Sequence, residues 1–81
     1  MAERNAISGR EAVRAFERAG WERVGRFEGY VALAQDGSRV TLIVPQSRTL
    51  SVGTIRALLR HSGLAPERFF ELLLGDQGAR P

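Results

Sequence analysis

Few residues of this chain have side chains suited to catalysis. It contains one histidine, His61, and no cysteine, which excludes a cysteine nucleophile and thiolate metal ligands. His61 falls in the last turn of a predicted helix, where a histidine commonly interacts with the helix dipole. Neither a metal-ligand spacing nor a Gly-rich phosphate loop is present in the sequence. We therefore expect no metal ion and no cofactor.

All basic residues of the chain are arginines. Twelve of them against nine acidic residues give a net charge of +3. Arginine suits bidentate phosphate contacts and stacking on bases. A GC-rich genome or a heat-adapted host would also favour arginine throughout. The composition alone thus leaves open both a nucleic-acid surface and an ordinary solvated surface.

The longest alternating apolar stretch surrounds Asp36-Gly37, a pair typical of two-residue hairpin loops. With these two residues as the loop, the opposed pairs would be Leu33 with Val40, Val31 with Leu42, Ala32 with Thr41, and Tyr30 with Ile43. Opposed residues share a face of the sheet. The predicted core face carries Val31, Leu33, Val40, Leu42 and Val44. The other face carries Tyr30, Ala32, Ala34, Arg39, Thr41 and Ile43.

One helix is predicted before the hairpin. Ser8 and Glu11 form a capping box, which predicts a helix over 9–19 that ends before Gly20. Trp21 is expected to pack across the end of this helix. Glu22 to Phe27 reads as a strand with poor alternation, which favours an edge strand or a twisted one.

Two more helices are predicted after the hairpin. The first begins near Ser51 or Val52, buries Val52, Ile55, Leu58, Leu59 and Ser62, and ends at Gly63. The second has Pro66 as its first residue and ends at Gly75.

These elements predict an α+β fold of two layers, with order α-β-β-β-α(-α). A three-stranded antiparallel sheet would carry helices on one face and leave its other face open. A chain of 81 residues forms one domain, expected over 7–74 with flexible tails at 1–6 and 75–81. Neither a leader nor an apolar run long enough to span a membrane is apparent, so we expect a cytoplasmic protein.

The open face is the most informative surface in this prediction. Tyr30, Ala32 and Ile43 would form an exposed apolar interface, together with Ala34 and edged by Arg39 and Thr41. A contiguous exposed apolar patch usually marks an interface. A tyrosine in such a patch can stack on a base or pack against a protein. The alternative is that the tail or a neighbouring molecule covers this patch.

The helix, the hairpin and the run Gly53-Thr54-Ile55-Arg56-Ala57-Leu58-Leu59-Arg60-His61-Ser62-Gly63-Leu64 together resemble the HicA family, also named YcfA. The segment Pro66-Glu67-Arg68-Phe69-Phe70-Glu71-Leu72 resembles the closing helix of that family. The likeness covers about 7–74. It implies a fold like the double-stranded-RNA-binding domain and an mRNA interferase toxin inhibited by a HicB-type antitoxin.

The sequence departs from the family pattern at the residues that carry the chemistry. HicA proteins usually have Gly-Ser-His before the second strand, and that histidine is catalytic. Here the matching residues are Glu28-Gly29-Tyr30, so Tyr30 occupies the histidine position. The loop Pro45-Gln46-Ser47 also lacks a second histidine that is frequent in the family. A tyrosine is a poor general base at neutral pH.

Three functions follow from this comparison. In the first, the domain binds RNA, with weak or lost ribonuclease activity. Tyr30 would then stack on a base while Arg26, Arg39, Arg48 and Arg56 contact phosphates. In the second, the open face binds a HicB-type antitoxin or a second copy of the chain. In the third, the domain is an active mRNA interferase with a site built on Tyr30 or His61.

Overall fold

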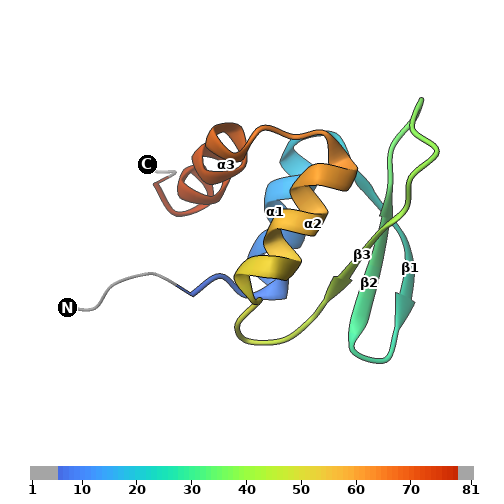
Figure 1. Cartoon of the computed structure of the whole chain (residues 1–81), viewed down its shortest axis with the longest axis horizontal. Helices are drawn as coiled ribbons and strands as arrows, with labels where there is room; N and C mark the ends of the chain where they lie inside the picture. Colours follow the sequence, from blue (N-terminus) through green and yellow to red (C-terminus); the bar gives the residue numbers. More distant parts are fainter. Residues whose placement is uncertain (1–5, 79–81) are drawn as a thin grey trace.

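The computed structural model describes residues 6–78 and has the predicted α+β fold (Figure 1). Its elements are α1 (Gly9–Arg18), β1 (Glu22–Phe27), β2 (Tyr30–Ala34), β3 (Leu42–Pro45), α2 (Val52–Ser62) and α3 (Pro66–Gly78). The strands form an antiparallel sheet in the order β1-β2-β3. The helices lie on one side of this sheet, which leaves its other face open, as the sequence predicts.

Hydrogen bonds fix both ends of α1. The amide of Glu11 donates to the Ser8 hydroxyl (3.1 Å), and the amide of Ser8 donates to the Glu11 carboxylate (3.0 Å), which confirms the capping box. At the other end, Gly20 adopts φ +101°, and the amide of Trp21 donates to the carbonyl of Phe16 (3.0 Å). This is a Schellman motif, which turns the chain from α1 into β1.

The hairpin of β2 and β3 has the predicted faces but a different register. The amide of Ser38 donates to the Gln35 carbonyl (3.0 Å), so the turn at Asp36-Gly37 forms. The strands pair differently: Leu33 lies opposite Leu42, Val31 opposite Val44, Ala32 opposite Ile43, and Tyr30 opposite Pro45.

The predicted register is therefore wrong by two residues. The cause lies on the descending side of the turn, where the Ser38 hydroxyl accepts the amide of Val40 (3.1 Å). That bond keeps Val40 out of the ladder, and Val40 is exposed instead of lying in the core. A two-residue shift leaves every other side chain on its predicted face, because the period of a strand is two.

Strand β1 is an edge strand with a bulge. Arg23 lies opposite Leu33 and Gly25 opposite Ala32, so Val24 is the extra residue between two regular stretches. The bulge explains the poor alternation of this segment, because it moves the residues after it to the other phase. Val24 is 60% exposed.

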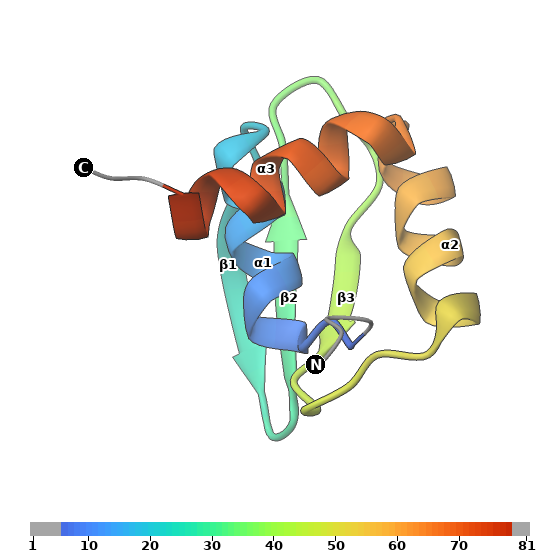
Figure 2. The same ribbon diagram turned by 90° about the vertical axis from the view of Figure 1, so that its left-hand side faces the viewer.

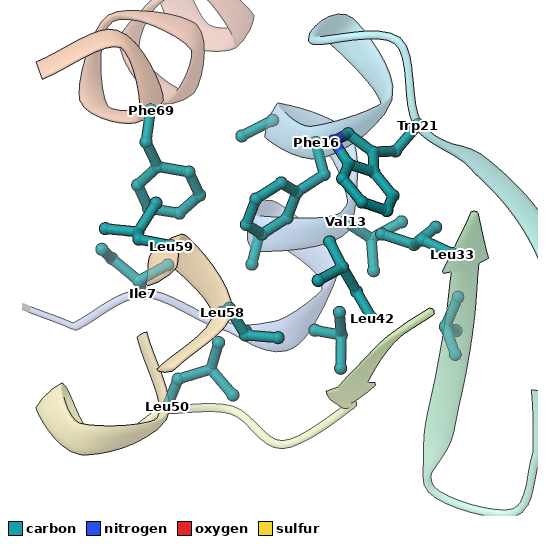
Figure 3. Close-up of a cluster of buried hydrophobic side chains, with 14 residues drawn as sticks. Ile7, Val13, Phe16, Trp21, Leu33, Leu42, Leu50, Leu58, Leu59 and Phe69 are labelled. Atoms are coloured by element: carbon teal, nitrogen blue, oxygen red, sulfur yellow. The ribbon is translucent and has the colours of Figure 1, made fainter. Parts of the chain in front are cut away.

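Aromatic side chains hold the helices together in the core (Figure 3). Phe16 of α1 is fully buried, with its ring centroid 5.2 Å from Phe69 of α3 and 6.5 Å from Trp21. Trp21 thus packs across the end of α1, as predicted. Burial of a phenylalanine side chain contributes about 1.5–3 kcal/mol to stability. Phe16 therefore joins α1, α3 and the start of β1.

The last two helices differ from the prediction at two residues. Helix α3 packs against α1 and continues through Gly75 to Gly78, so Gly75 does not end it (Figure 2). Glycine is a weak helix former but does not break a helix. Val52, predicted to be buried, is 64% exposed because it is the first residue of α2 and lies outside the core. Residues 1–5 and 79–81 of the predicted tails lie outside the described residues.

The start of α1 lies very close to the end of β3. The amide of Gly9 donates to the Ser47 carbonyl (2.9 Å), and the amide of Leu50 donates to the Ile7 carbonyl (2.8 Å). A Cβ atom at Gly9 would lie 1.9 Å from the carbonyl oxygen of Pro45. Only glycine fits at this position, because the obstructing atoms belong to the backbone.

We expect Gly9→Ala to lower the free energy of unfolding by about 1–3 kcal/mol, since the added methyl group must push two backbone segments apart. Thermal unfolding followed by circular dichroism measures the effect as a Tm lower by roughly 4 °C or more. The matched control is Gly53→Ala in α2, where the nearest atom to an added Cβ is the Ser51 hydroxyl oxygen at 3.9 Å. Equal Tm values for Gly9→Ala and the wild type would contradict the packing described.

Candidate functional site: the open face of the sheet

Three large apolar side chains are exposed together on the open face. Phe27 and Tyr30 are directly opposed across β1 and β2, and Ile43 lies opposite Ala32 on β3. The exposed fractions are 58% for Phe27, 45% for Tyr30 and 47% for Ile43. We call Phe27, Tyr30, Ala32 and Ile43 the open-face patch. It spans all three strands at the end of the sheet where β1 turns into β2.

Ala32 lies on this face but is not exposed, contrary to the prediction. It is only 4% exposed, although Tyr30, its neighbour on the same face of β2, is 45% exposed. The Phe27 ring lies back over Gly25, with its Cζ atom 3.6 Å from where a Cβ atom of that glycine would be. The same Cβ atom would be 3.5 Å from the Cβ of Ala32. The larger neighbours therefore cover Ala32, and Phe27, Tyr30 and Ile43 form the accessible surface.

Arg48 and Arg26 are at the same end of the sheet as Tyr30. Arg48 lies in the loop after β3, three residues beyond Pro45, which is opposite Tyr30. The amide of Gln46 donates to the Gly29 carbonyl (2.8 Å) and ties this loop to the turn before Tyr30. Arg26 is opposite Val31 and so belongs to the helix-bearing face, at the free edge of β1.

Arg39 and Arg56 are placed elsewhere. Arg39 lies in the loop between β2 and β3, at the other end of β2 from Tyr30, and this strand spans about 13 Å. Arg56 projects from α2, on the helix-bearing side of the sheet. The four arginines predicted to contact phosphates are thus spread over the molecule. Of these four, only Arg48 and Arg26 lie near the open-face patch.

The open-face patch offers stacking and apolar contact more than acid-base chemistry. His61 is in the last turn of α2, a helix that packs on the opposite side of the sheet from Tyr30. Glu28 is the nearest carboxylate in sequence and is exposed in the turn that precedes Tyr30. Among the described residues no group of His, Asp or Glu side chains is arranged to hold a metal ion.

The comparison with protein families decides which fold family this is. The family model described as the HicA toxin of bacterial toxin-antitoxin systems matches residues 9–64, more than half of the chain. The chain belongs to the HicA family. A comparison with curated proteins finds no match. The matched region includes α1, the entire sheet and α2, so the open-face patch lies within this HicA domain.

Sequence reasoning missed Phe27 as a member of the site. The signal was present in the turn Glu28-Gly29, where Gly29 adopts φ +82°. A two-residue loop at that turn places Phe27 opposite Tyr30, which the structure shows. The open-face patch therefore has exposed aromatic side chains at two opposed residues, where the sequence predicted one. None of its helices, over the part of the chain that is described, has the length and apolar character needed to cross a membrane.

Proposed function

We propose that this HicA domain of a toxin-antitoxin module binds single-stranded RNA through the open-face patch and cleaves it weakly or not at all. The observation that carries the proposal is that two opposed strand residues, Phe27 and Tyr30, both expose aromatic side chains on the open face. Base stacking on an aromatic side chain contributes about 1–3 kcal/mol per base. The antitoxin partner and the RNA substrate are those that membership of the family suggests.

Phosphate contacts complete the proposed RNA site. Arg48 and Arg26 flank the end of the sheet at which Tyr30 lies, so they are the first candidates. Arg39 and Arg56 would contact only an RNA that extends beyond the open-face patch. The likeness to the double-stranded-RNA-binding domain and a cytoplasmic location belong to the same proposal.

The chemistry of Tyr30 supports weak or absent cleavage. The resemblance drawn from the sequence implies that HicA proteins use a histidine at this position as the catalytic residue. A phenol is a poor substitute for imidazole as a base. The single histidine of the chain, His61, is on α2, which lies on the other side of the sheet from the open-face patch. The sheet therefore separates the two. Tyr30 thus keeps an aromatic ring at the site while the general base is lost.

We expect Tyr30→Ala to weaken binding of a fluorescein-labelled single-stranded RNA by about 5- to 150-fold, because the stacking surface is removed. Fluorescence anisotropy at low salt measures the affinity. Tyr30→Phe is the matched control, since it retains the ring and should bind within about twofold of the wild type. Undetectable binding by the wild type would refute the proposed RNA site.

Growth of cells that express the same variants separates binding from cleavage. Toxicity of the wild type that Tyr30→Phe abolishes would show an active interferase that uses the phenol hydroxyl, contrary to the proposal. Toxicity that appears only in Tyr30→His would instead support a site whose base has been lost.

We expect Arg48→Ala to reduce the steepness of the salt dependence of RNA binding. Loss of one phosphate contact lowers the slope of log K against log salt by about 0.7 for a single strand. Anisotropy titrations at several salt concentrations measure the slope. With a short oligonucleotide, Arg39→Ala should leave the slope unchanged, because Arg39 is at the far end of β2. A larger effect of Arg39→Ala would place the RNA elsewhere on the sheet.

A second function is supported by the apolar character of the same surface. We infer that the open-face patch is also suited to a protein contact, either with a HicB-type antitoxin or with a second copy of the chain. Phe27, Tyr30 and Ile43 are contiguous and exposed, and such patches on small domains usually mark an interface.

We expect Ile43→Glu to weaken that association by tenfold or more, since it introduces a charge into the apolar patch. Sedimentation of the domain alone and co-purification with an antitoxin from the neighbouring reading frame are the measurements. The Tm should stay within a few degrees of the wild type, because Ile43 is half exposed. A monomeric protein that binds no antitoxin would exclude this function.

A further inference from the structure

A groove lies on the helix-bearing side of the molecule, between α2, α3 and the segment that leads into α1. It has a volume of about 420 Å³ and is lined by the apolar residues Ile7, Val52, Ile55, Leu59, Pro66 and Phe70. Ligand pockets typically have volumes of roughly 300–1,000 Å³. We call this the α2–α3 groove. The helices that line it lie on one side of the sheet (Figure 1), and the open-face patch is on the other side.

The floor and the rim of the groove differ in exposure. Ile7 and Leu59 form the floor; they are 9% and 8% exposed and belong to the hydrophobic core, where they lie close together (Figure 3). The rim consists of Val52 of α2 and Phe70 of α3, which are 64% and 44% exposed. The core therefore opens to solvent between two exposed apolar side chains that come from different helices.

The groove continues along α2. A second hollow of about 280 Å³ shares Arg56, Leu59 and Pro66 with the first and extends to Arg60 and Leu64. From Val52 to Arg60 the helix rises about 12 Å. A surface of this length matches two turns of a bound helix. Such a helix places apolar side chains in a groove at positions i, i+3 or i+4, and i+7.

The charged residues that line the α2–α3 groove are all basic. Arg56 and Arg60 are four residues apart on α2, so they lie on the same side of the helix. Arg56 lines both hollows, and Arg60 lines the second. Among the described residues that line the two hollows none is acidic. The carboxylate of Glu71 on α3 is already paired with Arg68 at 3.0 Å.

We propose that the α2–α3 groove binds an amphipathic helix of a protein partner, one with an apolar face flanked by acidic residues. The apolar lining excludes a phosphate backbone as the main ligand, and the arginine pair selects carboxylates over ammonium groups. Acidic side chains four residues apart on the bound helix would match the spacing of Arg56 and Arg60. This site goes beyond the proposed RNA function because it uses a different surface.

The test uses the full chain and two synthetic helical peptides. In the first, leucines occupy i, i+3, i+4 and i+7 and glutamates flank them; in the second, lysines replace the glutamates. Binding is measured by fluorescence anisotropy and by amide shifts in two-dimensional NMR spectra. The leucine-glutamate peptide should bind saturably and shift Val52, Ile55 and Phe70, while the leucine-lysine peptide should bind at least about fivefold more weakly.

Charge reversal and rim variants locate the peptide. Arg60→Glu should weaken the leucine-glutamate peptide by about five- to tenfold and strengthen the leucine-lysine peptide, a reciprocity that loss of folding would not produce. Val52→Glu should weaken both peptides. Arg39→Glu is the matched control with the same change of charge away from the groove, and it should leave both affinities unchanged.

Several outcomes would overturn the proposal. Peptide shifts confined to Phe27, Tyr30 and Ile43, or equal affinities for the two peptides, would exclude the groove as a selective site. A single-stranded RNA that shifts the groove residues would assign the groove to nucleic acid, and a dimer broken by Phe70→Glu would assign it to a second copy of the chain. Tyr30→Ala should still bind the peptide, which separates failure here from failure of the RNA proposal.

Discussion

The backbone contact between the start of α1 and the end of β3 determines where both candidate surfaces lie. Gly9 approaches the carbonyl of Pro45 closely enough to exclude any side chain, and its amide donates to Ser47. On one side of this contact, Pro45 is opposite Tyr30 at the open end of the sheet. On the other side, the amide of Leu50 donates a hydrogen bond to the carbonyl of Ile7, which lies in the floor of the α2–α3 groove. One contact thus positions an aromatic surface and an apolar, basic groove on opposite sides of a small domain.

Sequence periodicity predicted the faces of the hairpin better than its register. Side chains alternate between the two faces of a strand, so a shift of the pairing by two residues leaves each side chain on the same face. The apolar residues Val31, Leu33, Leu42 and Val44 therefore identify the core face whichever of these registers forms. Register depends on hydrogen bonds near the turn, and the bond from the Val40 amide to the Ser38 hydroxyl is not visible in an apolar pattern. The helix caps were predictable for the opposite reason, because each depends on residues three or four apart in sequence.

The composition of the candidate site was only partly predictable from sequence. Tyr30 and Ile43 follow from alternation, whereas Phe27 was hidden by the bulge at Val24, which breaks the period on which such reasoning depends. Ala32 was placed on the right face, but its burial depends on the size of neighbours from two other strands. The α2–α3 groove requires Ile7 to pack against two helices that are far from it in sequence, so no local pattern could indicate it.

The stability of the fold does not depend on the side chain at Tyr30. The core consists of Phe16, Phe69 and the apolar face of the sheet, and none of these side chains lies on the open face. Tyr30 is nearly half exposed, so exchange of its ring for an imidazole changes little buried area. Phe27, the residue opposite Tyr30, is also exposed, so neither side chain contributes to the core. The fold therefore determines where this residue lies, whereas its acid-base character can change without loss of the core.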